Sequence, residues 1–140
     1  PSLSLARPAR IYFPGTLFAG EATREWHRTH QFPLLAWASL AAGFMSGKFK
    51  PDDPSDEYVT KVYYSEENFE RLRRAQELGR RKNVTSLQVG LAYVLQQAFP
   101  VVALVGPTTV VNLNEALGAL QVELTPKEME FLDLIKKRKA

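Results

Sequence analysis

Two short apolar runs, each followed at once by a loop of small residues, constrain the fold of this chain more than any other feature. The runs are residues 32–37 and 101–105, and the loops are residues 38–48 and 106–109. Apolar runs of this length are typical of buried strands in a parallel sheet, and small residues beyond a strand let a ligand approach the backbone. Helical patterns separate the two runs, so we expect an α/β fold with parallel crossover connections.

Local signals predict where the helices begin. Ser65, Thr85 and Thr125 can each cap a helix, and Thr85 and Thr125 have the spacing of a capping box. The expected helices span residues 21–30, 65–82, 85–98 and 109–120, with a last one from residue 125, while residues 1–5 are expected to form a strand and residues 6–20 and 50–56 loops. The run at 101–105 is apolar throughout, which predicts a strand buried on both faces. About three strands are too few to close a barrel, so we expect residues 1–140 to form a single domain that is part of an enzyme fold.

The charge distribution argues against a protein that binds nucleic acid. The net charge is +3, but the cluster at residues 136–139 carries +4 by itself, and the rest of the chain has 14 basic and 15 acidic residues. A basic cluster of this kind is typical of a solvated tail. No apolar run approaches the length of a membrane span. We therefore expect neither nucleic acid nor a membrane among the partners.

The chain has no cysteine. Disulfides, thiolate catalysis and cysteine metal sites are therefore excluded. This composition suits a reducing compartment, and we expect a cytoplasmic location.

Two groups of side chains that often carry chemistry receive a structural interpretation. His27 and His30 stand three residues apart on a short expected helix, but no third ligand accompanies them, so we expect no metal site. Tyr58, Tyr63 and Tyr64 flank an expected charged loop, and Lys61 lies close to them in sequence. A catalytic tyrosine needs a Lys or His against its ring, and no sequence signal places Lys61 there.

The loop after the first apolar run combines small residues with one positive charge. Residues 41–47 are mostly Ala, Gly and Ser, and Lys48 follows them. Exposed backbone N–H groups beside a lysine suit a diphosphate. The P-loop pattern is absent, and a tight turn with an exposed lysine explains the same residues.

The loop after the second run opens a helix. Thr108 or Thr109 can cap that helix, or the N–H groups at its N-terminus can bind a phosphate. Asn112 and Glu115 follow one and two turns later on a similar face, where they either bond to a ligand or face solvent. Both interpretations stay open at this point.

These residues carry a resemblance to a known enzyme family. The segment Trp37–Phe49, WASLAAGFMSGKF, is similar to the loop after the seventh strand of aldo-keto reductases. Residues 105–120 resemble the eighth strand and its helix, residues 122–132 resemble the entry to the final helix, and residues 1–6 resemble the end of the sixth strand. The resemblance covers nearly the whole chain in order. It implies an α/β fold that is the C-terminal portion of a TIM (β/α)8 barrel, incomplete in this chain.

The resemblance also implies a cofactor and the residues that bind it. The family reduces carbonyl compounds by hydride transfer from NADP(H), and NAD(H) is the alternative here. The implied cofactor-binding residues are Ala38, Ser39, Leu40, Ala41, Gly43 and Lys48 for the pyrophosphate, and Gly106, Thr108, Asn112, Glu115 and Ala116 for the 2′-phosphate and adenine. No Arg stands at Thr108 or Thr109, which implies weak selectivity for the 2′-phosphate.

The resemblance gives the chain no catalytic residue. The catalytic Asp, Tyr, Lys and His of the family lie in the first half of its barrel, and no segment of this chain matches that half. We therefore expect the chain to be inactive by itself. Its expected partners are the nicotinamide cofactor, a small carbonyl substrate in the complete enzyme, and either the missing N-terminal half or a further copy of the chain. The alternative function is a non-catalytic nucleotide-binding or interaction module made from a barrel fragment.

Overall fold

A two-stranded parallel sheet joins two segments that lie far apart in the sequence. The computed structural model describes residues 21–36 and 38–134. Within these residues, β1 (Leu34–Ala36) pairs in parallel with β2 (Val101–Ala103), so that Leu34 lies opposite Val101 and Ala36 opposite Ala103. The expected parallel crossover is therefore confirmed. The expected strand at residues 1–5, the loop at 6–20 and the basic cluster at 136–139 lie outside the described residues.

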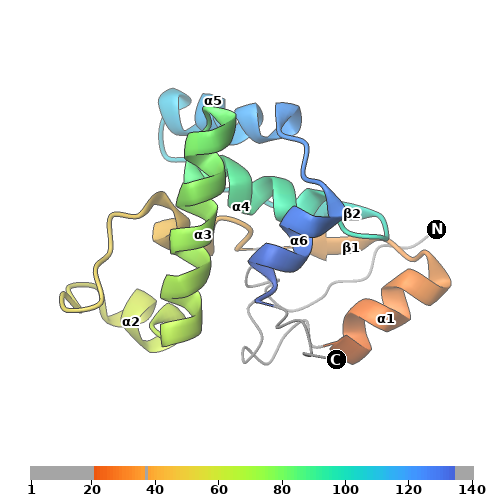
Figure 1. Cartoon of the computed structure of the whole chain (residues 1–140), viewed down its shortest axis with the longest axis horizontal. Helices are drawn as coiled ribbons and strands as arrows, with labels where there is room; N and C mark the ends of the chain where they lie inside the picture. Colours follow the sequence, from red (N-terminus) through yellow and green to blue (C-terminus); the bar gives the residue numbers. More distant parts are fainter. Residues whose placement is uncertain (1–20, 37, 135–140) are drawn as a thin grey trace.

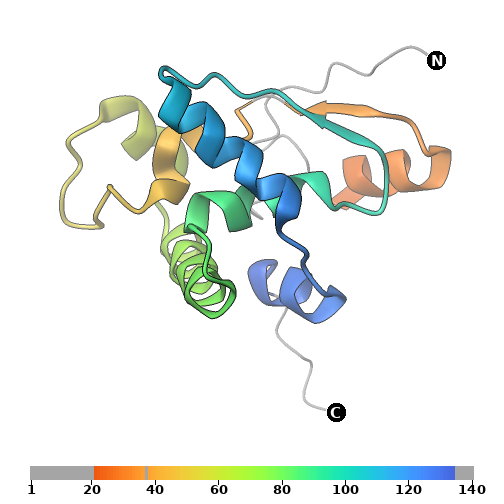
Figure 2. The ribbon, with the colours of Figure 1, turned by 90° about the horizontal axis from the view of Figure 1, so that it is seen from above.

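Most of the described chain is helical. Before β2 come α1 (Glu21–His30), the 3-10 helix η1 (Ala41–Ser46), α2 (Glu57–Tyr63), α3 (Glu66–Lys82) and α4 (Ser86–Leu95), and after β2 come α5 (Val110–Gly118), the 3-10 helix η2 (Ala119–Gln121) and α6 (Pro126–Leu132). Figure 1 shows α3 crossing in front of α4. Figure 2 shows that α4 lies between the two strands on one side and α3 with α6 on the other.

Side-chain caps begin the helices where the sequence predicts them. The Ser65 hydroxyl accepts a hydrogen bond from the Asn68 N–H at 3.2 Å, which starts α3. Thr85 and Thr125 both form complete capping boxes, at the starts of α4 and α6. Each cap satisfies backbone donors that the first helical turn leaves without a partner. The predicted starts of these three helices are therefore confirmed.

The C-terminal end of α4 differs from the prediction. We expected a helix to about Ala98, whereas α4 ends at Leu95. The reason is a set of side-chain contacts that replaces the next helical turn. The side chain of Gln96 accepts from the Leu124 N–H at 2.9 Å and donates to the Val122 carbonyl at 2.5 Å, which ties this end of α4 to the segment before α6.

One α-helix was not predicted. The sequence predicts a charged loop flanked by the three tyrosines, and this prediction is wrong, because residues 57–63 form α2 and Tyr58 and Tyr63 stand on that helix. The side chain of Asp56 caps α2 by accepting from the Val59 N–H at 2.9 Å. An Asp cap followed by Glu57 is a local helix signal, and the many charges around it conceal the apolar pattern.

The main core lies between β1, η1 and the helices α2, α3 and α4. Leu34, Ala36, Phe44 and Tyr63 are completely buried there. The Phe44 ring lies 6.0 Å from that of Tyr63, centroid to centroid, in a stacked arrangement. The Ser86 hydroxyl donates to the Met45 carbonyl at 2.7 Å and thereby fixes η1 against the start of α4. The packed side chains of this core therefore hold β1 and the loop after it in place.

β2 is covered much less than β1, and the prediction that residues 101–105 are buried on both faces is wrong. Among the described residues β2 pairs with β1 alone, and Val102 keeps 46% of its surface exposed. Further exposed apolar side chains lie in the loop after β2, on α5 and in η2. We call this surface the open side; its residues are Val102, Leu104, Val105, Val110, Val111, Leu113, Leu117 and Leu120.

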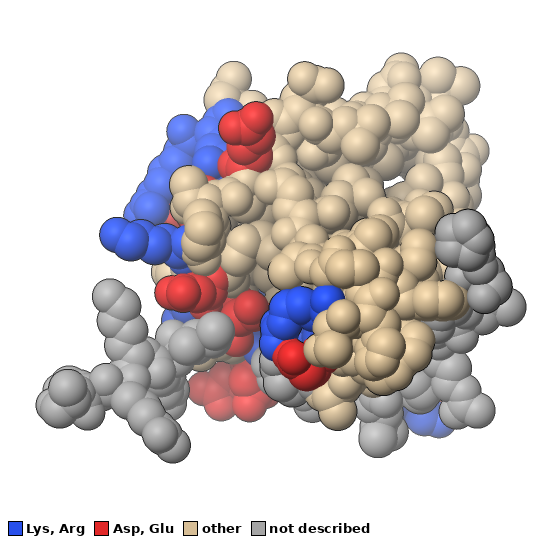
Figure 3. Space-filling view, turned by 90° about the vertical axis from the view of Figure 1, so that its right-hand side faces the viewer, with Lys and Arg blue, Asp and Glu red and all other residues tan. Residues whose placement is uncertain are grey.

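Charged side chains are distributed unevenly over the described surface. On the face that Figure 3 shows, Lys, Arg, Asp and Glu lie along the left side and in the lower part, and uncharged residues cover most of the upper right. On α3, Glu70 forms ion pairs with Arg73 and Arg74, and Glu77 forms one with Arg81. No helix within the described residues is long and apolar enough to cross a membrane.

Candidate functional site

The loop after β1 makes a tight, left-handed turn. Ala38, Ala41 and Ala42 adopt φ values of 56°, 49° and 51°, and Gly43 follows at 81°. The left-handed region costs a residue with a Cβ about 1–2 kcal/mol, so three alanines there store backbone strain. Two hydrogen bonds hold the turn: Ala41 N–H donates to the Ala38 carbonyl at 2.8 Å, and Gly43 N–H donates to the Leu40 carbonyl at 2.9 Å.

The end of this loop brings Lys48 back over the turn. Cε and Nζ of Lys48 lie 3.5 and 3.6 Å from the point where a Cβ on Gly43 would stand. The Ser46 hydroxyl donates to the Gly43 carbonyl at 2.7 Å and also accepts from the Lys48 N–H at 3.4 Å. The ammonium group is therefore held beside a backbone turn that has no side chain at Gly43. This is a suitable place for a phosphate oxygen.

The loop after β2 reaches the same end of the sheet. The Leu104 N–H donates to the Ala36 carbonyl at 2.6 Å, so the strand pairing extends one residue past β2. A Cβ on Gly106 would meet no atom within 4 Å, so the backbone there borders open space. The Thr109 hydroxyl accepts from the Asn112 N–H at 3.1 Å and caps α5, and the Asn112 side chain donates to the Thr108 hydroxyl at 3.2 Å.

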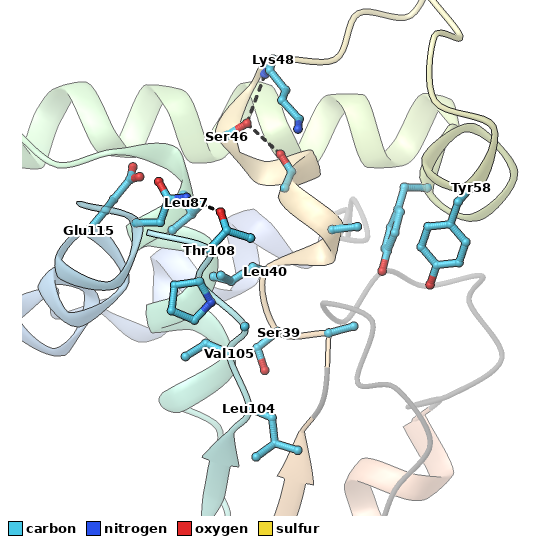
Figure 4. A pocket seen from close by; sticks show the side chains of 17 residues that line it. Ser39, Leu40, Ser46, Lys48, Tyr58, Leu87, Leu104, Val105, Thr108 and Glu115 are labelled. Carbon is cyan, nitrogen blue, oxygen red and sulfur yellow. Dashed lines mark hydrogen bonds between the residues drawn. The ribbon is translucent and has the colours of Figure 1, made fainter. Parts of the chain in front are cut away.

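The two loops border one cavity of about 520 Å³ beyond the carboxyl ends of β1 and β2. Figure 4 shows Ser39, Leu104 and Val105 near the strand ends, Lys48 beside Ser46 just past the end of η1, and Glu115 with Thr108 across from Tyr58. Parallel strands bring the loops that follow them to one edge of the sheet, and ligand sites form there in α/β enzymes.

Nine of the eleven predicted cofactor-binding residues line this cavity. They are Ala38, Ser39, Leu40, Gly43, Lys48, Gly106, Thr108, Asn112 and Glu115. Ser39 is 1% exposed, and its hydroxyl donates to the Ala36 carbonyl at 2.9 Å, so its side chain holds the turn.

The other two predicted residues do not line it. Ala41 is completely buried in the main core, because the left-handed turn directs its methyl group inward. Ala116 is buried beside Leu91 and Ala119, on the face of α5 that packs against α4.

Several residues that line the cavity were not predicted. Ala42, Ser46, Leu104, Val105 and Pro107 are close neighbours in sequence of predicted residues, so the loop signal already contained them. Tyr58, Tyr63 and Leu87 come from α2 and α4 and reach the cavity only through tertiary packing. Tyr58 keeps 53% of its surface exposed, whereas Tyr63 is buried against Phe44.

The two histidines have structural contacts. His27 is 2% exposed, its Nδ1 lies 2.7 Å from the Phe32 carbonyl oxygen, and its ring stacks 5.4 Å from that of Phe99. The Nδ1 atom of His30 lies 2.8 Å from the Trp26 carbonyl oxygen. Across residues 21–36 and 38–134, no group of three His, Cys, Asp or Glu side chains is close enough to hold a metal ion.

The cavity combines several groups that can bind a phosphate. Lys48 provides a cation beside a tight turn, Gly106 leaves its backbone open to a ligand, and Thr108 provides a hydroxyl. The capped N-terminus of the nine-residue α5 adds the positive end of a helix dipole. These donors suit a phosphate-containing ligand with polar ribose groups.

Known proteins were compared with the chain. The model of the Aldo/keto reductase family matches residues 17–137. Aldo-keto reductase yakc [NADP(+)] of Schizosaccharomyces pombe is 31% identical over 105 residues, which are 70% of this chain and 31% of the relative. Aldo-keto reductase str7 of Strobilurus tenacellus is 30% identical over 103 residues, which are 69% of this chain and 31% of the relative. The chain thus spans about a third of the length of these curated relatives.

A solved structure has the same fold over the matched part. It is the thermostable aldo-keto reductase Tm1743 in complex with the inhibitor epalrestat, with a TM-score of 0.60, 23% identity and coverage of 81% of this chain and 33% of that chain. The similarity confirms an α/β fold related to the TIM barrel of these reductases. Because the family model matches most of the sequence, the chain belongs to the aldo/keto reductase family.

Proposed function

We propose that this chain is the C-terminal portion of an aldo-keto reductase barrel and provides the part that binds the nicotinamide dinucleotide. The observation that carries the proposal is the cavity at the carboxyl ends of β1 and β2, where Lys48 and Gly106 come together from two distant loops. A barrel enzyme binds its ligands at this end of its strands. The chain belongs to a family of oxidoreductases, and this membership also supports a cofactor site at the carboxyl ends of the strands.

The cofactor is NADP(H) or NAD(H). The NADP(+) in the name of the Schizosaccharomyces pombe relative supports NADP(H). When bound, the dinucleotide supplies the hydride that reduces a small carbonyl substrate in the complete enzyme. Within this chain, Lys48 neutralises a phosphate, Gly106 admits the ligand to the backbone, and the turn at residues 38–43 holds Lys48 in place.

Residues outside this chain would transfer the proton. The resemblance places the catalytic Asp, Tyr, Lys and His of the family in the first half of the barrel, which this chain does not match. The purified chain should therefore fail to reduce aldehydes with either NADPH or NADH. Robust turnover by the 140-residue chain, with no other polypeptide present, would contradict the proposal that residues outside this chain transfer the proton.

The open side supports a second element of the proposal. Its apolar residues on β2 and α5 suit either the missing N-terminal half of the barrel or a further copy of the chain. The alternative function, a non-catalytic nucleotide-binding or interaction module, uses the same surface. Addition of a polypeptide that completes the barrel separates the two, because turnover then appears only if the chain is part of an enzyme.

Direct binding tests the proposed function. Titration of the chain with NADPH and with NADH, followed by the fluorescence of the reduced nicotinamide, should give saturable binding of at least one of them. If neither nucleotide binds, the cavity is not a dinucleotide site in this chain and the proposal is wrong.

A further inference from the structure

A second cavity lies at the end of the sheet away from the proposed dinucleotide site. Its volume is about 550 Å³, which is within the range of small-molecule sites. Its walls come from α1, from the turn between α4 and β2, and from α6 with the residues beside it. None of the described residues that line it belongs to the open side. The second cavity is therefore separate from the surface that further protein would cover.

The walls of the second cavity carry charges of both signs. Arg24 and Arg28 stand four residues apart on α1, and Glu130 and Asp133 stand three residues apart at the end of α6. Such spacings place two side chains on one face of a helix. The two cations and the two carboxylates come from different elements, and their charges sum to zero. A ligand with one charged group of each sign therefore matches these walls better than a simple anion or cation.

Arg24 and Asp133 form an inner pair that fixes the shape of the cavity. Their side chains are 20% and 18% exposed, and Arg24 Nη1 lies 3.5 Å from Asp133 Oδ1. The Tyr93 hydroxyl donates to the same oxygen and accepts from Arg24 Nη1 at 3.4 Å. These contacts join α1, α4 and α6. Because they all go to Oδ1, the second carboxylate oxygen of Asp133, Oδ2, accepts no hydrogen bond within the described residues.

Arg28 and Glu130 form an outer pair with bonding capacity left for a ligand. Glu130 is exposed, and across residues 21–36 and 38–134 its carboxylate takes part in no ion pair or hydrogen bond. Arg28 pairs through Nη2 with Glu25 on its own helix, but the two side chains are 47% and 52% exposed, so this pair is weak. A guanidinium has five N–H donors. Arg28 can therefore bind a carboxylate, and Glu130 with Asp133 Oδ2 can bind an ammonium group.

The lining also includes an apolar surface. Phe99, Leu124, Pro126 and Met129 provide it. Phe99 is 6% exposed and its ring stacks 5.4 Å from that of His27, so this part of the wall is rigid. Met129 has a flexible side chain that adapts to apolar groups of different shape. A ligand for this cavity therefore carries an apolar group besides its two charges.

We infer that the second cavity binds a small zwitterion, a free α-amino acid with an apolar side chain. Its carboxylate bonds to Arg28, its ammonium group bonds to Glu130 and to Asp133 Oδ2, and its side chain packs against Leu124 and Met129. The inference goes beyond the proposed function and does not depend on it, because no described residue lines both cavities.

Three related ligands test the inference on the 140-residue chain. L-leucine, N-acetyl-L-leucine, which lacks the cation, and L-leucinamide, which lacks the carboxylate, are titrated separately at pH 7 and followed by the backbone amide signals of the labelled chain. L-leucine should shift the signals of Phe99, Met129 and Glu130 in a saturable way. Each analogue loses one pair of charge-assisted hydrogen bonds and should bind about tenfold more weakly.

Matched variants assign the two charged ends of the ligand. Arg28→Gln and Glu130→Gln change exposed side chains and should each weaken the binding of L-leucine about tenfold. Arg28→Gln should leave the binding of L-leucinamide unchanged, and Glu130→Gln should leave that of N-acetyl-L-leucine unchanged, because each ligand already lacks the group concerned. Arg80→Gln and Glu66→Gln make the same charge changes at exposed positions outside the lining and should bind L-leucine like the wild type.

The outcomes also separate this inference from the proposed function. Absence of saturable shifts with L-leucine at the second cavity would overturn the inference. Equal affinity for L-leucine and either analogue, or equal weakening in the control variants, would show that the cavity does not recognise a zwitterion. NADH binding should be the same in Arg28→Gln and Glu130→Gln as in the wild type, and a failure of the wild type to bind NADH would overturn the proposed function alone.

Discussion

The two strands of the sheet are covered to very different degrees. Leu34 and Ala36 in β1 are completely buried, whereas Val102 in β2 is 46% exposed. On α5, Val110 and Val111 leave 73% and 75% of their surfaces exposed. The side of β1 is thus a closed core within the described chain, and the side of β2 is not.

This difference indicates where the rest of a barrel would be attached. A strand in a closed barrel has a neighbour on each edge, and the helices around it cover its outer face. Each strand has one neighbour among the described residues, so the two strands differ in side-chain burial and not in pairing, and further exposed apolar residues lie on α5. The part of the site on the β1 side therefore rests on a complete core, and the part on the β2 side stands at the edge of a surface that further protein would cover.

The largest predicted effect is the difference in stability between a substitution in β1 and one in β2. Leu34→Ala removes a fully buried side chain and should lower the free energy of unfolding by about 2–5 kcal/mol. Val102→Ala, at an exposed position almost opposite, should change it by less than about 0.5 kcal/mol. Urea unfolding measures both. If Val102→Ala were as destabilising as Leu34→Ala, the open side would be covered in the folded chain.

A change in the loop after β1 should weaken dinucleotide binding. Lys48→Ala removes the cation of the cavity and should cost about 1.5–3 kcal/mol of binding free energy through loss of a charge-assisted phosphate contact. Fluorescence titration measures the dissociation constant. Lys127→Ala removes the same charge from α6 and serves as the control, because it lies outside the cavity lining. Equal dissociation constants for wild type and Lys48→Ala would show that Lys48 is not part of the site.

The open side should make the isolated chain associate. We expect concentration-dependent self-association at micromolar concentrations, because an uncovered strand edge and apolar patch bind each other or further protein. Leu104→Lys and Leu117→Lys place charges on this surface and should each weaken association about tenfold, which is about 1.4 kcal/mol.

Sedimentation velocity distinguishes the monomer from larger assemblies of the chain. Ser55→Lys adds the same charge to an exposed loop and should associate like the wild type. A stable wild-type monomer at micromolar concentration, with strongly protected amides in both strands, would show that the chain closes on itself and would contradict the barrel-fragment account.

The smallest predicted effect lies on α3, in the closed region. Hydrogen bonds from Arg73 and then Arg74 lower the pKa of Glu70 from 4.5 to about 2. A lowered pKa in the folded state means that the carboxylate stabilises the fold above about pH 4.5 and that this contribution disappears as the pH falls toward 2.

Glu70→Gln should therefore remove up to about 1 kcal/mol at pH 7, a discounted figure because Glu70 is partly exposed to solvent. The variant should also lose stability less steeply than the wild type between pH 4.5 and pH 2, measured by urea unfolding. High salt should narrow the difference between the two proteins. Identical pH dependence would show that the arginine contacts contribute nothing to stability.

The sequence predicts features whose causes are local. The hydroxyls of Ser65, Thr85 and Thr125 start their helices through backbone groups three residues away, and the structure contains these contacts. The parallel pairing of β1 and β2 is also predictable, because an apolar run, a long helical stretch and a second run favour a crossover.

Features set by distant contacts were not predictable. Tyr58 reaches the cavity because α2 packs beside η1, and no residue near it in sequence indicates this position. Ala41 belongs to a small-residue loop that suits a ligand, yet its positive φ turns the methyl group into the core. The exposure of Val102 depends on which strands surround β2, which the apolar run itself does not specify.

The most direct test of the account is a map of the dinucleotide site on the chain by NMR. On addition of NADH, backbone amide signals should shift in residues 38–48 and in residues 104–115, which form the loop after β2 and the start of α5, because both segments border one cavity at the strand ends. The opposite end of the sheet also has a cavity, bordered by Arg24, Arg28, Phe99 and Met129, and the signals of these residues should stay unchanged. Shifts confined to the cavity around Arg24 and Arg28, or no saturable shifts in either loop, would contradict the proposed site.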